Sequence, residues 1–159
     1  MMRIPIFFVV AFTLLLASCG SAPQPSASEA AKTAPIEKPP DEWRRLPRPD
    51  FVESKVIDTQ LMGKPFMPGG TLGRYKKGNT EYEMFIAQTA SVDAATILVV
   101  DWKNALTDPK VERSYGGYSG MDAGRPMFIF AKGAWIAGVA GLPREEAAPK
   151  ASLLLLYLD

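Results

Sequence analysis

The chain has 159 residues, with 18 lysines and arginines against 17 acidic residues, one cysteine and no histidine. Charges this balanced create no field that gathers nucleic acid, so we expect no nucleic-acid partner. Without histidine the chain cannot build Ser-His-Asp or Cys-His catalysis, and it lacks the commonest zinc ligand. Carboxylate, lysine or tyrosine chemistry and oxygen-ligated calcium remain, and we expect a non-enzymatic protein without a cofactor.

The first 18 residues have the layout of a secretory signal peptide. Arg3 precedes an apolar run from Ile4 to Ala17, and small residues follow that run. A helix that spans a bilayer needs about 20 apolar residues, which is more than this run supplies. Residues 1–18 are therefore predicted to be a cleaved signal rather than a permanent span.

The four residues Leu16-Ala17-Ser18-Cys19 resemble the lipobox of bacterial lipoproteins. This resemblance implies cleavage before Cys19, lipidation of that cysteine and attachment to a membrane of the cell envelope. Gly20 stands where the inner-membrane retention signal of Gram-negative lipoproteins has Asp. That implies the outer membrane, with the domain facing the periplasm, if the cell is Gram-negative. The alternative is a plain cleaved signal followed by a coincidental cysteine.

Composition divides the rest of the chain into two parts. Residues 19–40 comprise the lipidated cysteine and a segment rich in Pro, Ser and Ala, with Ile36 as its one aliphatic residue. Such a segment cannot bury enough apolar surface to offset its ordering entropy, so it is predicted to be a disordered tether. Residues 41–159 have globular composition and are predicted to form a single domain.

The first half of this domain predicts strands followed by a helix. Residues 51–57 indicate a weak strand, and residues 71–76 and 80–89 indicate a hairpin that turns at residues 77–79. Ser91 is a typical helix N-cap, and apolar residues then recur at helical spacing until Pro109. Residues 97–102 could alternatively form a buried strand, but the longer stripe and its two end signals favour the helix.

The second half predicts further strands and a last helix. Residues 111–115 indicate a strand, residues 116–124 a glycine-rich loop, and residues 126–131 with 134–139 a second hairpin. Residues 151–158 predict a C-terminal helix, with Pro149 at a kink or in its first turn. The order ββ-α-βββ-α predicts an α+β domain, in which an antiparallel sheet of about five strands carries both helices on one face.

The segment 115–125 is the first candidate for a binding site. Glycines let a backbone approach a ligand closely, tyrosines offer amphipathic contact, and an acid with a base can orient a polar group. Nucleotide-binding glycine spacing is absent, and the alternative is a plain connecting loop with Asp122 and Arg125 paired in solvent. The candidate contact residues for a ligand or partner are Tyr115, Tyr118, Asp122, Arg125 and Trp135.

Two other patterns have both a functional and a structural interpretation. Glu81 and Glu83 share one face of a predicted strand and could form an acid/base pair, although alternating charge on a solvated face is more ordinary. Trp43 lies among three arginines, Arg44, Arg45 and Arg48. That cluster could dock a partner or an anionic headgroup, but solvated charges beside the tether are the more ordinary interpretation. Trp135 shares a predicted strand face with Ala137 and Val139, which favours a place in the core.

From about Lys76 onward the arrangement resembles uncharacterised single-domain bacterial lipoproteins. The shared features are a small-residue helix start at residues 90–95, a glycine-containing stretch, an aromatic hairpin at residues 128–135 and an apolar C-terminal helix. The resemblance supplies no catalytic residues. We therefore expect a lipid-anchored envelope protein that binds an envelope protein partner or, alternatively, a small molecule through the 115–125 loop and Trp135. A carboxylate-dependent enzyme is the third alternative.

Overall fold

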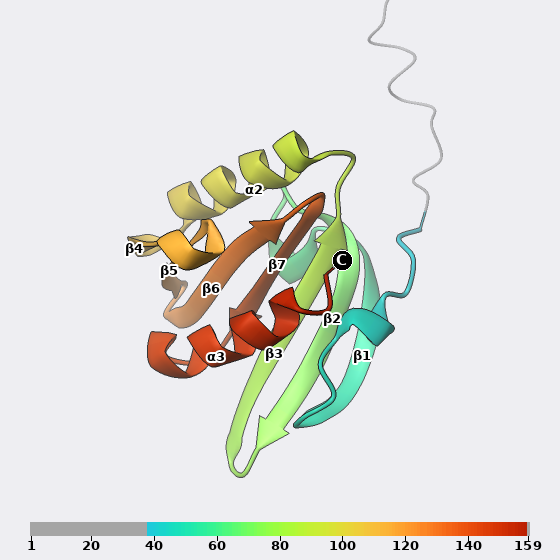
Figure 1. Ribbon diagram of the computed structural model, residues 1–159, viewed down its shortest axis with the longest axis vertical. Helices are drawn as coiled ribbons and strands as arrows, with labels where there is room; N and C mark the ends of the chain where they lie inside the picture. Colours follow the sequence, from blue (N-terminus) through green and yellow to red (C-terminus); the bar gives the residue numbers. More distant parts are fainter. Residues whose placement is uncertain (1–37, 159) are drawn as a thin grey trace, which may run out of the picture. The chain divides into compact units, whose positions relative to one another are not determined.

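A single antiparallel sheet of seven strands forms the centre of the computed structural model, which describes residues 38–158 (Figure 1). The predicted signal peptide, Cys19 and most of the predicted tether lie outside the described residues. The strands are β1 (Phe51–Thr59), β2 (Pro68–Lys77), β3 (Thr80–Gln88), β4 (Thr107–Glu112), β5 (Gly117–Asp122), β6 (Arg125–Lys132) and β7 (Trp135–Ala140). Their order across the sheet is β1-β2-β3-β7-β6-β5-β4.

Two α-helices and three short 3₁₀ helices complete the domain. The α-helices are α2 (Val92–Ala105) and α3 (Arg144–Leu155), and the 3₁₀ helices are η1 (Trp43–Arg45), η2 (Leu61–Gly63) and η3 (Arg113–Tyr115). None of the helices between residues 38 and 158 is long and apolar enough to cross a bilayer. The predicted α+β class is confirmed.

The two predicted hairpins are present and meet in the middle of the sheet. Strands β2 and β3 pair out to Lys77 and Thr80, and β6 and β7 pair out to Lys132 and Trp135. Strand β3 then pairs antiparallel with β7, which joins the two hairpins side by side. Each hairpin turns through a glycine with positive φ, 60° at Gly78 and 55° at Gly133, as two-residue turns require.

The sheet has two more strands than the expected five. One is β1, the predicted weak strand, which pairs along β2. The other is β5, which replaces most of the predicted glycine-rich loop, so the loop prediction was wrong. A Cβ atom at Gly117 would overlap the Ile129 carbonyl oxygen. Glycine here lets β5 lie close against β6, so the glycines that indicated a loop instead permit strand pairing.

The two helices cover opposite faces of the sheet, so the predicted packing on one face was also wrong. Helix α3 packs on an α3-side core that includes Met84 and Ile86, whereas α2 packs on an α2-side core that includes Phe85 and Ala87. Successive strand residues point to opposite faces, so β3 contributes to both cores. All six residues of β7 are buried, and a sheet with two apolar faces needs a cover on each.

Helix α2 begins as the sequence predicts. The Ser91 hydroxyl accepts a hydrogen bond from the Ala94 amide at 3.1 Å, which satisfies one of the free amides of the first turn. The buried face carries Ala95, Val99 and Trp102, and the Trp102 indole stacks on Phe85 with ring centroids 6.1 Å apart. The helical interpretation of residues 97–102 is confirmed.

Helix α3 begins earlier than expected, at Arg144, and ends at Leu155. Pro149 lies inside it, and the buried residues Ala147, Ala151 and Leu154 face the α3-side core. Residues 156–158 form a closing turn rather than more helix, although Leu158 is buried. The predicted range 151–158 was therefore too short at its start and too long at its end.

Candidate functional site

The predicted contact residues are divided between the two faces of the sheet. The Tyr115 hydroxyl donates to the Ala148 carbonyl of α3 at 3.0 Å, and its ring meets Phe128 edge-on at 4.9 Å on the α3 side. Tyr118 packs against the α2-side core, with the Lys103 ammonium 5.7 Å from its ring centre. The two tyrosines are therefore not brought together.

Asp122 and Arg125 occupy opposing positions in the β5–β6 pairing, yet each has a partner elsewhere. The Lys64 ammonium donates to Asp122 at 2.5 Å, and the Arg125 guanidinium donates to Glu83 at 2.8 Å. The expectation of an Asp122–Arg125 pair in solvent was therefore wrong. These contacts connect β5 to the η2 segment and β6 to β3.

The two glutamates of β3 each face a cation rather than one another. Glu83 binds Arg125, and exposed Glu81 lies 3.4 Å from the Lys76 ammonium. Trp135 is 7% exposed within the α3-side core, as its strand pattern predicts. It lines a cavity of only about 30 Å³, together with Pro39 and Pro40. The geometry assembles neither an acid/base pair nor an open tryptophan pocket at these residues.

A buried carboxylate that sequence reasoning missed lies beside a larger cavity. Glu112 is 3% exposed and accepts hydrogen bonds from the Ser119 hydroxyl at 2.6 Å and from two nitrogens of Arg144, at 2.5 and 2.9 Å. Burial raises the pKa of the Glu112 carboxyl, but the hydrogen bonds from Arg144 and Ser119, with the charge of Arg144, outweigh burial and hold that pKa below its ordinary value.

The cavity beside this cluster has a volume of about 320 Å³. Arg144 and Lys110 line it from α3 and β4, and Leu142 and Met127 add apolar surface. Residues 119–121 of the predicted contact segment also line it, although none of the five predicted contact residues does. Two cations beside apolar surface are suited to a small anionic molecule, although Arg144 is already bound to Glu112 and the carboxylate of Asp108 also lines the cavity.

A second polar cluster joins the start of β1 to α3. Lys150 donates to Asp50 at 2.6 Å, and the Tyr82 hydroxyl donates to the same carboxylate at 3.2 Å. The hydrogen bond from Lys150 holds the pKa of Asp50 below its ordinary value, and burial raises the pKa of Tyr82. Lys150 and Tyr82 line a cavity of about 410 Å³ with Glu145 and Glu146. Burial lowers the pKa of Lys150, but its bonds to Asp50 and Tyr82 outweigh burial and raise it, so the amine stays charged.

An open apolar groove of about 500 Å³ lies beside the start of α2. Its lining contains no charged side chain, and Ile97 of α2 is 60% exposed there. We call this surface the α2 groove, and its lining residues are Phe66, Met67, Pro68, Gln88, Thr89, Ala90, Ala94, Ile97 and Leu98. Exposed apolar surface of this kind is typical of contact sites.

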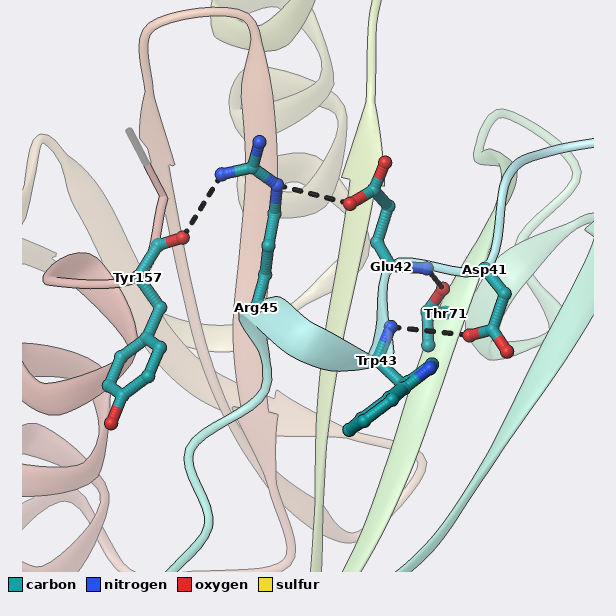
Figure 2. A network of polar contacts seen from close by, with 6 residues as sticks. All are labelled: Asp41, Glu42, Trp43, Arg45, Thr71 and Tyr157. Atoms are coloured by element: carbon teal, nitrogen blue, oxygen red, sulfur yellow. Dashed lines mark hydrogen bonds and ion pairs between the residues drawn. The ribbon is translucent and has the colours of Figure 1, made fainter.

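The segment that enters the domain, residues 38–50, crosses the α3 side of the sheet (Figure 2). The Glu42 amide donates to Thr71 of β2 at 3.0 Å, and Arg45 donates to the Tyr157 carbonyl at 3.2 Å. The Arg45 guanidinium also lies 4.8 Å from the ring centre of Trp135. This arginine therefore joins the two ends of the described chain.

The remaining arginines of the Trp43 cluster flank its ring. The guanidinium of Arg48 lies 4.1 Å from the Trp43 ring centre and that of Arg44 lies 5.7 Å away. Both arginines are exposed, so the cluster presents an indole between two cations. The Trp43 cluster was predicted because its residues are neighbours in the sequence. The α2 groove was not predicted, because residues 66–68 and 88–98 come together only in the fold.

Comparison with protein-family models, with curated proteins and with solved structures finds no match to this chain. Among residues 38–158, no group of three or more acidic or cysteine side chains is placed to hold a metal ion. The candidate sites are therefore judged on their own geometry. Of the cavities described above, the α2 groove alone has no charged side chain in its lining.

Proposed function

We propose that this chain is an envelope lipoprotein, anchored through lipid on Cys19, whose domain is a non-catalytic binding module facing the periplasm. The lipobox-like residues 16–19 and the apolar run before them support the anchor. Two acyl chains are sufficient for stable membrane attachment, since each buried CH₂ contributes about 0.8 kcal/mol. Gly20 supports the outer membrane of a Gram-negative cell.

The binding role is supported above all by the α2 groove. Ile97 is exposed there next to Leu98 and Phe66, and an apolar segment of an envelope protein is the occupant that this lining fits. One cation at each of the two polar cavities is instead already paired, Arg144 with Glu112 and Lys150 with Asp50. These ion pairs favour a structural role for the polar clusters.

A small-molecule ligand is the second candidate, and the cavity of about 320 Å³ favours it. This cavity is not the predicted site formed by the 115–125 loop and Trp135. Residues 119–121 line the cavity, but Trp135 does not. An anionic ligand would bind Lys110 and compete with Glu112 for Arg144. A carboxylate-dependent enzyme has less support, since Glu81 and Glu83 each face a cation.

The anchor is tested by expressing the wild type and Cys19→Ala in a Gram-negative host with labelled palmitate. We expect the wild type to take up label and to fractionate with the outer membrane, and Cys19→Ala to lose both properties. Equal, unlabelled soluble material from both chains would contradict the anchor.

The groove is tested in the same cells with a photo-crosslinking amino acid in place of Gln88, whose exposed side chain lines the groove. A cross-linked envelope protein should be lost when Ile97→Asp is added. Val92→Asp is the matched control, because Val92 is 59% exposed on the same helix but does not line the groove. Equal cross-linking in both variants would contradict a role for the groove.

A further inference from the structure

Of the three arginines beside Trp43, only Arg45 has an acidic partner within the described part of the chain. Its guanidinium donates to Glu42 at 3.1 Å, and η1 directs the side chains of Trp43 and Arg45 in different directions (Figure 2). Arg44 and Arg48 are exposed and form no ion pair with the described residues. We call Trp43, Arg44 and Arg48 the arginine patch.

The backbone that carries Arg48 is held in place on both sides. Pro47 and Pro49 flank this arginine, fix their own φ angles and restrict the residue before each of them. Leu46 and Pro47 are buried, and the Phe51 amide donates to the Arg48 carbonyl at 3.1 Å. The Arg48 backbone is therefore in position before a ligand binds, which lowers the entropic cost of binding.

The guanidinium of Arg48 lies over two aromatic rings. It is 4.1 Å from the Trp43 ring centre and 5.6 Å from the Phe51 ring centre. Contact with an aromatic ring occupies the flat face of a guanidinium and leaves the N–H groups around its edge. The Arg48 side chain donates no hydrogen bond to the described residues. Those N–H groups can therefore bind two oxygens of a phosphate group at once.

The third member of the patch is an indole that is partly open to solvent. Trp43 is partly exposed, whereas Trp102 is 0% exposed and Trp135 is 7% exposed. Tryptophan is enriched where lipid headgroups meet water, because its ring is apolar and its N–H is polar. Guanidiniums that bind phosphate beside such an indole are suited to a phospholipid surface.

The unpaired charges of the entering segment, residues 38–50, are mostly positive. Asp41 is its one acid without an ion pair, and the Asp41 carboxylate accepts a hydrogen bond from the Trp43 amide at 3.2 Å. Three exposed cations, Lys38, Arg44 and Arg48, accompany this single acid. Such an excess of positive charge is attracted to a membrane that contains anionic lipids.

We propose that the arginine patch docks the domain onto anionic lipid headgroups of the membrane that holds its anchor. Arg44 and Arg48 bind phosphate oxygens, and the Trp43 ring lies between neighbouring headgroups. This inference rests on the proposed lipid anchor at Cys19, because an anchor on the same chain raises the effective concentration of headgroups at the patch. The contact does not use the α2 groove, and it gives the anchored domain a fixed orientation on the membrane.

The test uses the full chain, lipidated in a Gram-negative host and reconstituted into vesicles of phosphatidylcholine with or without phosphatidylglycerol. Flotation with phosphatidylcholine alone measures the anchor. Tryptophan fluorescence measures docking, because Trp43 is the least buried of the three tryptophans. With phosphatidylglycerol present we expect a blue shift and quenching by brominated lipid, and high salt should weaken both. Trp43→Phe should remove both signals.

Charge variants separate docking from anchoring. Arg44→Gln combined with Arg48→Gln should lose the blue shift and still float as the wild type does. The matched control is Lys55→Gln combined with Arg113→Gln, which removes two exposed cations elsewhere in the domain and should keep the blue shift. Asp41→Asn removes the unpaired acid and should move docking to a lower content of phosphatidylglycerol.

Two results would overturn the docking while leaving the anchor intact. One is an equal blue shift in the two double variants. The other is a wild type that floats but shows no spectral change with phosphatidylglycerol, which would favour an anionic protein surface as the partner of the patch. A wild type that does not float with phosphatidylcholine alone would contradict the anchor at Cys19 and, with it, the docking. Flotation and fluorescence therefore distinguish the two failures.

Discussion

Arg144, the first residue of α3, binds both carboxylate oxygens of Glu112, the last residue of β4. This relationship joins the helix on one face to an edge strand of the sheet. The Glu112 side chain is 4% exposed whereas that of Arg144 is 51% exposed, so a buried anion is neutralised by a cation that reaches in from the surface. The Ser119 hydroxyl adds a third donor, from the adjacent strand β5.

The first prediction is that Glu112 makes stability depend on acidity. Its folded-state pKa lies below the ordinary value of 4.5, so its contribution is fully present above pH 4.5 and is lost as the pH falls through the folded-state value. Glu112→Gln should cost about 1–3 kcal/mol of unfolding free energy at pH 7, and less in acid. Urea denaturation of both chains at several pH values measures this difference.

The control for that experiment is Glu53→Gln, which removes half of an exposed ion pair. It should change the unfolding free energy by no more than about 0.5 kcal/mol. If the loss of unfolding free energy in Glu112→Gln stayed constant down to pH 3, the charge of the Glu112 carboxylate would contribute nothing to stability. That result would contradict the prediction.

The second prediction contrasts two tyrosines that stack on each other with ring centroids 5.0 Å apart. The Tyr75 hydroxyl is buried and has no hydrogen-bond partner among the described residues, whereas the Tyr82 hydroxyl donates to Asp50. An unsatisfied buried hydroxyl costs about 1–3 kcal/mol, so Tyr75→Phe should leave stability unchanged or raise it. Tyr82→Phe should lower it by about 0.5–1.5 kcal/mol.

The midpoint of urea denaturation, at unchanged slope, measures both tyrosine variants. Each serves as the control for the other, since the same atom is deleted from two neighbouring rings. A loss in Tyr75→Phe as large as that in Tyr82→Phe would mean that the Tyr75 hydroxyl has a partner.

The third prediction concerns two adjacent glycines with different roles. Gly116 has a φ of 62° and open space at its Cβ position, whereas a Cβ at Gly117 would meet the Ile129 carbonyl oxygen. Gly116→Asn should be nearly neutral, because asparagine tolerates the left-handed region. Gly117→Ala should cost about 1–3 kcal/mol by forcing β5 away from β6. Amide hydrogen exchange in β5 should rise in the second variant only.

The sequence correctly predicted the helix and the hairpin turn whose stabilising contacts lie between neighbouring residues. The Ser91 cap and the Ala95-Val99-Trp102 stripe lie within one helix, and the turn at Gly78 lies within one hairpin. Each of these predictions is confirmed, because neighbouring residues supply both the pattern and the contact that satisfies it.

The remaining features depend on residues that are distant in the sequence. The residues next to Gly117 in the sequence do not indicate that Ile129 of β6 will lie against it. The glycines of β5 were therefore interpreted as a loop. Asp122 pairs with a lysine 58 residues away, and Arg125 with a glutamate 42 residues away. The face chosen by each helix depends on the sheet being apolar on both sides, which becomes evident only when β3 and β7 are paired. The Glu112 cluster likewise needs three separate elements.

The contact between Arg45 and Tyr157 has a consequence for folding kinetics. These residues are 112 positions apart, and the pairing of β3 with β7 also joins segments that are distant in the sequence. Contacts of such separation form only after the loop-closure entropy of the intervening chain has been overcome, so domains dominated by them fold slowly. Until those segments have docked, both apolar faces of the sheet stay exposed to other chains, and this is the interval in which the protein is open to aggregation.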